Sequence, residues 1–151
     1  MKIAVITSKF NQEITEKLKS GALEILKANN IDVLAIDVPG AVEIPITAQR
    51  VAKSKQVDAI IALGAVIRGE TTHYDYVCEM VSQGCLRVSL DFDIPVIFGV
   101  LTTENEAQAY DRLGGAHGHK GKESAECAIE LHKTLLQFTP DIGSTNQRVT
   151  S

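Results

Sequence analysis

Residues 64–76, Gly-Ala-Val-Ile-Arg-Gly-Glu-Thr-Thr-His-Tyr-Asp-Tyr, combine residue types suited to anion binding and to proton transfer. An apolar run at 57–63 leads into this stretch, and an amphipathic segment follows His73. The order predicts a strand, a loop and a helix. Such a loop offers free backbone N–H groups at the positive end of a helix dipole, which suits an anionic or phosphorylated ligand. His73 would then transfer protons beside the bound anion.

Other candidate ligand-binding side chains each have an ordinary structural alternative. Phe10 either covers the sheet edge or offers a flat face on which a heterocycle stacks. Glu43 either interacts with a helix dipole or accepts hydrogen bonds from ligand hydroxyls. Arg68 is more typical of a structural or solvated arginine than of a ligand. Arg112 either complements a helix C-terminus or binds phosphate.

Three histidines, His73, His117 and His119, raise the alternative of a zinc site. A glycine-flanked histidine pair is more typical of surface polar residues, so we expect no metal. The sequence has no Walker loop, no dinucleotide-binding fingerprint and no GxSxG motif. The usual sequence support for an NTPase, a dehydrogenase or a serine hydrolase is therefore lacking.

Short apolar runs alternate with amphipathic segments, and these elements must position the candidate residues. The expected strands cover residues 3–7, 32–38, 57–67 and 95–101. The expected helices cover residues from about 14 to 29, 41–54, 73–92 and 122–138. A further short helix is expected to be capped by Thr102 to Glu104 and to end near Arg112. Residues 114–121 form a glycine-dense link.

This alternation predicts an α/β fold, specifically a three-layer α/β/α sandwich of the flavodoxin-like type with a four-stranded parallel sheet. Ligands of such sheets bind beyond the carboxyl ends of the strands, where the unusual residues of this chain gather. With 151 residues we expect one domain, comprising a core at about 3–138 and a polar C-terminal tail at 139–151.

Composition disfavours several classes of partner. The net charge is −4 and the basic residues are scattered, so we expect no nucleic acid. No apolar run approaches the roughly 20 residues that span a bilayer, and we expect a cytoplasmic protein without a membrane partner. Cys78, Cys85 and Cys127 lack CxxC spacing and are expected to be reduced thiols on the apolar sides of helices.

Five segments together resemble the 6,7-dimethyl-8-ribityllumazine synthase family. They are Ser-Lys-Phe-Asn at 8–11, Val-Pro-Gly-Ala-Val-Glu-Ile-Pro at 38–45, the block at 63–76, Pro-Val-Ile-Phe-Gly-Val-Leu-Thr-Thr at 95–103, and Arg112 with Lys120-Gly121. They occur in the family's order and at its separations from about residue 3 to residue 138. The Arg-Gly-x-Thr-Thr-His block, with Pro-Gly-Ala-x-Glu before it, is the most specific part of the match.

The resemblance implies the penultimate step of riboflavin biosynthesis, without a metal or cofactor. In that reaction 5-amino-6-(D-ribitylamino)uracil condenses with 3,4-dihydroxy-2-butanone 4-phosphate to give 6,7-dimethyl-8-ribityllumazine. By this resemblance His73 transfers protons. The residues implied to bind the pyrimidine and the ribityl chain are Phe10, Asn11, Ala41, Val42, Glu43, Val66, Ile67, Phe98 and Lys120. Those implied to bind phosphate are Gly69, Glu70, Thr71 and Arg112.

The resemblance also implies active sites shared between subunits, with Phe98, Arg112 and Lys120 supplied by the neighbour. Ala116 and His119 occupy the Lys and Asn positions of a pattern associated with sixty-subunit icosahedral shells, and we expect no N-terminal extension before the first strand. We therefore expect a homopentamer, with the icosahedral 60-mer as the alternative. We also expect a functional link to riboflavin synthase.

Three other functions remain as alternatives. They are a non-catalytic flavin- or lumazine-binding paralogue, a scaffold protein with a vestigial pocket, and a metal-dependent hydrolase on the same fold. The joint presence of Glu43, His73, Arg112 and Lys120 argues against a paralogue that has lost turnover.

Overall fold

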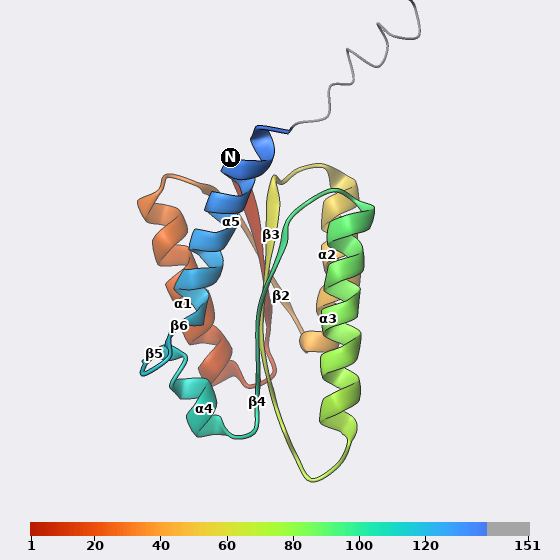
Figure 1. Ribbon diagram of the computed structural model, residues 1–151, viewed down its shortest axis with the longest axis vertical. Coiled ribbons are helices and arrows are strands. Elements are labelled where there is room, and N and C mark those ends of the chain that lie inside the picture. The colour runs from red at the N-terminus through yellow and green to blue at the C-terminus, as the bar shows by residue number, and fades with distance from the viewer. Residues whose placement is uncertain (139–151) are drawn as a thin grey trace, which may run out of the picture.

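Four parallel strands form the central sheet of the computed structural model, which describes residues 1–138 (Figure 1). The strands are β1 (Lys2–Ser8), β2 (Asp32–Val38), β3 (Ala59–Ile67) and β4 (Val96–Thr103). They lie in the order β2-β1-β3-β4, and every neighbouring pair is parallel. The expected four-stranded parallel sheet is thus confirmed.

Helices cover both faces of this sheet, as expected for a three-layer α/β/α sandwich (Figure 1). One face packs against α1 (Gln12–Ala28) and α5 (Lys120–Leu136), and the other against α2 (Ile44–Ser54) and α3 (His73–Asp91). Successive side chains of a strand point to opposite faces. Ile3 and Val5 therefore join the core under α1 and α5, whereas Ala4 and Ile6 join the core under α2 and α3.

The strand order creates a topological switch point between β1 and β3. The chain leaves β1 through α1 on one face of the sheet and leaves β3 through α3 on the other, so the two connections diverge at the carboxyl edge. A crevice outside the carboxyl ends of two such strands is the usual ligand site of open α/β sheets. The loops at residues 9–11 and 68–72 border this crevice.

The expected start of the second helix and the expected cap of the short helix were wrong. Residues Ala41–Glu43 form a 3₁₀ turn, η1, and the second helix begins only at Ile44. Thr102 and Thr103 do not cap the short helix α4 (Glu106–Tyr110), because both still belong to β4 and pair with β3. The cap is Asn105, whose side-chain oxygen accepts a hydrogen bond from the backbone of Gln108 at 2.9 Å.

The expected glycine-dense link is an antiparallel hairpin formed by β5 (Leu113–Gly115) and β6 (Gly118–His119). Gly114 and Gly118 have φ values of 98° and 74°, which glycine adopts without strain. The last helix consequently begins at Lys120 rather than 122.

The prediction for the cysteines was correct for Cys85, which is buried, and wrong for Cys127, which is exposed. The buried positions of α5 recur at Gly121, Ala125 and Ala128, and this phase points Cys127 outward. None of the helices within residues 1–138 is long and apolar enough to cross a membrane. The expected tail at 139–151 lies outside the described residues.

Candidate functional site

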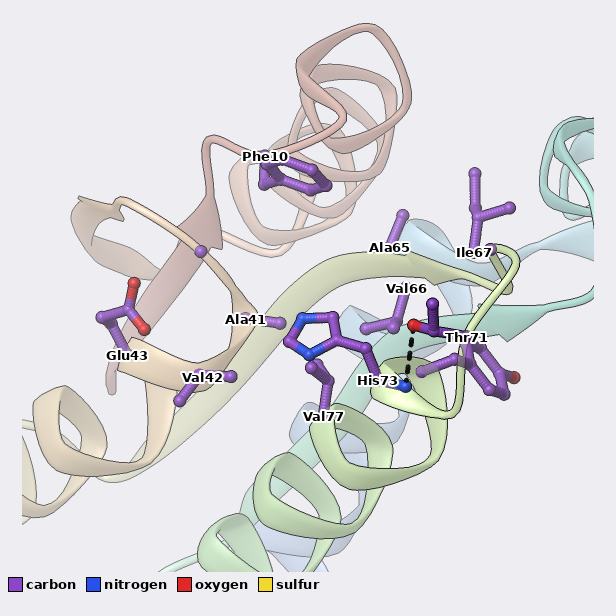
Figure 2. A pocket seen from close by; sticks show the side chains of 13 residues that line it. Phe10, Ala41, Val42, Glu43, Ala65, Val66, Ile67, Thr71, His73 and Val77 are labelled. Carbon is purple, nitrogen blue, oxygen red and sulfur yellow. Dashed lines mark hydrogen bonds between the residues drawn. The ribbon is translucent and has the colours of Figure 1, made fainter.

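A pocket of about 350 Å³ opens at the carboxyl edge of the sheet, between the loop after β1, η1 and the start of α3 (Figure 2). We call it the histidine pocket. Its lining includes most of the residues expected to bind substrate from this chain, namely Phe10, Ala41, Val42, Glu43, Val66, Ile67, Gly69, Thr71 and His73. Gly40, Ala65, Tyr74 and Val77 complete the lining. Sequence reasoning missed these four, although Val77 follows His73 by one helical turn.

Phe10 stands at the mouth of the pocket with 69% of its surface exposed. Its backbone N–H donates to Ser8 Oγ at 3.2 Å, which fixes the turn that carries the ring. A ring that is this exposed covers little of the sheet edge. Its exposure and its place in the pocket lining favour the stacking alternative.

Asn11 adjoins the pocket but does not line it. Its backbone has φ 60°, a left-handed conformation that asparagine tolerates better than most residues. The side-chain Nδ2 donates to the carbonyl oxygen of Ala65 at 2.8 Å, which ties the loop after β1 to β3. One function of Asn11 is therefore to hold the Phe10 loop, and only its Oδ1 remains to accept a hydrogen bond from a ligand.

The 3₁₀ turn η1 brings Ala41, Val42 and Glu43 to one wall of the pocket. Gly40 before it is extended, and the Glu43 carboxylate lies over it, so that a Cβ at Gly40 would be 3.4 Å from Oε1. Glu43 is half-buried and forms no ion pair within residues 1–138. An ionised carboxylate is an acceptor only, so its oxygens can accept hydrogen bonds from ligand hydroxyls.

Opposite η1, the loop at residues 68–72 leads from β3 into α3 and is exposed along its length. The backbone N–H groups of Gly69, Glu70 and Thr71 form no hydrogen bond within the described part of the chain. Gly69 and Thr71 line the pocket, whereas Glu70 does not. Free N–H groups just before a helix of 19 residues form a favourable site for an anion.

His73 is the first residue of α3, and its ring points toward η1 (Figure 2). The backbone N–H of His73 donates to Thr71 Oγ1 at 3.3 Å. The imidazole is exposed to solvent in the isolated chain. It thus stands between the anion loop and the wall that carries Glu43, within reach of ligand atoms bound to either.

Arg68 lies outside the pocket and is held by side chains of its own chain. Its Nε donates to Glu104 Oε2 at 2.6 Å and its second guanidinium nitrogen to Asp75 Oδ1 at 3.3 Å. These two carboxylates raise the pKa of Arg68. The guanidinium also lies over the Tyr74 ring, 4.4 Å from its centroid. The contacts agree with the structural alternative for this residue.

A second pocket, also of about 350 Å³, lies beyond the edge strand β4, and we call it the arginine pocket. It is lined by Phe98, Val100, Leu101, Thr102, Thr103, Arg112, His117, Lys120 and Glu123. It shares no lining residue with the histidine pocket. The structure therefore does not bring Phe98, Arg112 and Lys120 together with His73 inside one chain.

Hydrogen bonds to backbone carbonyls hold the Arg112 side chain and the backbone of Lys120 in the arginine pocket. One terminal nitrogen of Arg112 donates to the carbonyl oxygen of Gln108 at 2.7 Å, and the backbone N–H of Lys120 donates to the carbonyl oxygen of Arg112 at 2.8 Å. Both residues are half-buried. The guanidinium keeps further donors for an anionic ligand.

The histidines of the hairpin lie apart from the histidine pocket. His119 caps α5, because its Nδ1 accepts a hydrogen bond from the backbone of Lys122 at 3.3 Å, and its ring packs against Gly21 of α1. His117 lines the arginine pocket. Across residues 1–138, no group of three His, Cys, Asp or Glu side chains is arranged to hold a metal ion.

Comparison with known proteins shows which sequences this chain resembles. Residues 1–135 match the family model described as 6,7-dimethyl-8-ribityllumazine synthase. A 6,7-dimethyl-8-ribityllumazine synthase of Coxiella burnetii (strain Dugway 5J108-111) is 49% identical over 140 residues, covering 91% of this chain and 93% of that protein. The protein of the same name from strain RSA 493 / Nine Mile phase I is 50% identical over 142 residues, with the same coverage of both chains.

Proposed function

The chain belongs to the 6,7-dimethyl-8-ribityllumazine synthase family and is an enzyme of riboflavin biosynthesis, and from this premise we propose how its residues carry out the reaction. The enzyme condenses 5-amino-6-(D-ribitylamino)uracil with 3,4-dihydroxy-2-butanone 4-phosphate. An amine of the uracil attacks the ketone and loses water to form an imine. Phosphate is then eliminated, and ring closure releases a second water to give 6,7-dimethyl-8-ribityllumazine.

The pyrimidine substrate binds in the histidine pocket between Phe10 and the wall formed by Val66 and Ile67. Phe10 stacks on the heterocycle, and backbone groups of β3 contact its polar edge. Ala41, Val42 and Glu43 of η1 bind the ribityl chain, whose hydroxyls donate to the Glu43 carboxylate. What supports this assignment is the meeting of one exposed aromatic face and one unpaired carboxylate in a single pocket.

The phosphate of the second substrate binds to the loop at Gly69, Glu70 and Thr71 through backbone N–H groups. The three free N–H groups and the N-terminus of α3 support this role. Glu70 does not line the pocket, so we assign to it only its backbone N–H. Bound there, the phosphate holds the ketone beside the pyrimidine amine.

His73 transfers protons during imine formation and phosphate elimination, because its imidazole lies between the anion loop and η1. Proton transfer by a positioned side chain contributes roughly 10²–10⁴-fold to a rate. Holding two reactants in one orientation contributes on the order of 7–11 kcal/mol to lowering the barrier. Proximity therefore supplies the larger part of the catalysis, and His73 the smaller part.

Each active site is completed by Phe98, Arg112 and Lys120 of a neighbouring subunit. The separation of the two pockets in one chain supports this proposal, because the charges that would hold the phosphate lie beyond β4. Exposed apolar side chains on α3 support self-association as well, with Tyr76, Met80 and Leu90 exposed by 65%, 57% and 73%. We propose a homopentamer in the cytoplasm, with the 60-mer as the alternative.

Product formation from the two substrates, followed by lumazine absorbance with and without a strong chelator, tests the proposed mechanism and its chemistry without a metal. Turnover that persists in chelator is expected, whereas sensitivity to the chelator would favour the metal-dependent alternative. Sedimentation in the same buffer tests the assembly. Five chains of 16.3 kDa give a particle of about 82 kDa, far below the mass of a 60-mer.

The Arg112→Ala variant tests the phosphate assignment. We expect a raised KM for the phosphorylated substrate and an unchanged dissociation constant for the pyrimidine substrate, because only the former carries the anion. A KM equal to that of the wild type would remove Arg112 from this role.

A further inference from the structure

The side chain of Arg68 joins three separate elements beside the phosphate loop. The residue stands at the start of the loop, directly after β3. Its guanidinium contacts Glu104, which follows β4, and Asp75, in the first turn of α3. Both contacts are charge-assisted hydrogen bonds, and the guanidinium fork can make two of them at once without rotating.

The loop has few other restraints. Every residue between Arg68 and His73 is exposed, and a Cβ built on Gly69 would meet no atom within 4 Å. Within the described chain its backbone bonds lie at its ends: Arg68 N–H donates to Thr103, and on the α3 side His73 N–H donates to Thr71 Oγ1 and Asp75 N–H donates to Thr72. The contact from Arg68 to Asp75 spans the loop and so fixes the distance between those ends.

The guanidinium is directed mainly toward its own chain and lies outside the histidine pocket. Two of its three nitrogen atoms are bonded to carboxylates, and one face lies against the Tyr74 ring. The ion pairs are also solvent-exposed, with side-chain exposures of 38% for Arg68 and 57% for both partners. Exposed pairs contribute little to the free energy of unfolding, so loss of Arg68 leaves the chain folded.

We propose that Arg68 is a positioning residue for the reaction: it holds the Gly69–Thr71 loop in its anion-binding conformation by bonding Glu104 and Asp75, and does not itself bind phosphate. The inference rests on the proposed phosphate role of that loop. A positioning role differs from a general stabilising role because loss of Arg68 should weaken the binding of one substrate only. The phosphorylated substrate should bind more weakly, while the pyrimidine site between Phe10 and η1 stays intact.

The test compares Arg68→Gln, Arg68→Lys, Glu104→Ala and the double variant Arg68→Gln/Glu104→Ala. We expect Arg68→Gln to raise the KM for the phosphorylated substrate, and the inhibition constant of inorganic phosphate, by about tenfold, a usual size for members of one hydrogen-bond network. Arg68→Lys should lie between this variant and the wild type, because one ammonium cannot hold both carboxylates in the same geometry. The dissociation constant of the pyrimidine substrate should change by less than about twofold.

Glu104→Ala separates positioning from direct binding. If Arg68 only positions the loop, removing its anchor raises the KM for the phosphorylated substrate even though the site becomes more positive. The double variant should then raise this KM by less than the product of the two single fold-changes, because both substitutions remove the same contact. A fall in this KM for Glu104→Ala would overturn the proposal, since it would show that a released Arg68 binds phosphate directly.

Two further measurements make a negative result interpretable. Arg50→Gln removes an exposed arginine of α2 away from the loop and should change none of these constants. An unchanged KM in Arg68→Gln, together with a raised KM in Arg112→Ala, would overturn only the role of Arg68. Unchanged values in both variants would overturn the phosphate assignment and the inference with it.

Discussion

A mixture of two defective variants should recover activity that neither variant has alone. His73→Ala damages the histidine pocket, and Arg112→Ala damages the arginine pocket. If each site combines the histidine pocket of one subunit with the arginine pocket of its neighbour, co-expressed chains form some sites in which both halves are intact. Random assembly from equal amounts makes about a quarter of the sites fully intact.

The expected magnitude follows from the separate losses. His73→Ala should lower kcat/KM by about 10²–10⁴-fold, the range for a positioned acid or base. Arg112→Ala should lower it by about 10–150-fold, which corresponds to 1.5–3 kcal/mol for hydrogen bonds to a charged group. The mixed assembly should therefore retain about a quarter of the wild-type kcat/KM, well above the value of either variant. In that quarter of the sites, an intact histidine pocket of one subunit meets an intact arginine pocket of its neighbour.

The assay is lumazine formation by the co-expressed, co-purified assembly, at substrate concentrations below the KM of the wild type. The matched control mixes the same purified variants without subunit exchange, and this sample should show only the mean of the two single activities. If co-expression also gives no more than that mean while sedimentation shows mixed assemblies, the shared-site reasoning is refuted. The two pockets would then have to serve separate functions.

Three further predictions concern single residues. Glu43→Gln should raise the KM for the pyrimidine substrate and leave that for the phosphorylated substrate unchanged, because the carboxylate faces only the polyol; equal changes in both would contradict this division. Asn105→Ala should lower the free energy of unfolding by about 1 kcal/mol in a urea titration, since it removes the side-chain cap of α4. Burial raises the pKa of Cys85 from 9.0 to about 11, so at pH 8 Cys85 should resist a thiol reagent that labels exposed Cys127 in the folded chain. The same shift means that the contribution of Cys85 to the free energy of unfolding is complete below pH 9.0 and falls as the pH rises toward 11.

The alternation of strands and helices was readable from the sequence because each element carries its own periodicity. The run at 59–65 is buried on both faces of the sheet, and a continuous apolar run of that length is typical of a parallel strand. The hairpin at residues 113–119 was not readable in this way. It contains no apolar pattern, and its turns depend on positive φ angles at Gly114 and Gly118 that a glycine-rich link does not by itself reveal.

Prediction of the candidate site was similarly uneven. The residues after each strand could be expected to meet, because carboxyl ends of parallel strands share one edge of the sheet. The hydrogen-bond partners of individual side chains could not be predicted. Asn11 donates to Ala65, 54 residues away, and Arg68 reaches Glu104, 36 residues away. Such contacts depend on register and loop geometry, which residue types do not specify.

The positions of the two pockets in the sheet are the structural basis for the proposed shared active site. The switch point between β1 and β3 fixes the crevice that holds Phe10 and His73. Arg112 and Lys120 follow β4, at the edge of the sheet, and they line a pocket that shares no residue with that crevice. In the proposed assembly, a second copy would present its arginine pocket to this crevice and supply these cations without any change of fold. We therefore expect dissociation of the assembly to abolish turnover even when every chain remains folded, a result that activity and circular dichroism measured across a dilution series would separate.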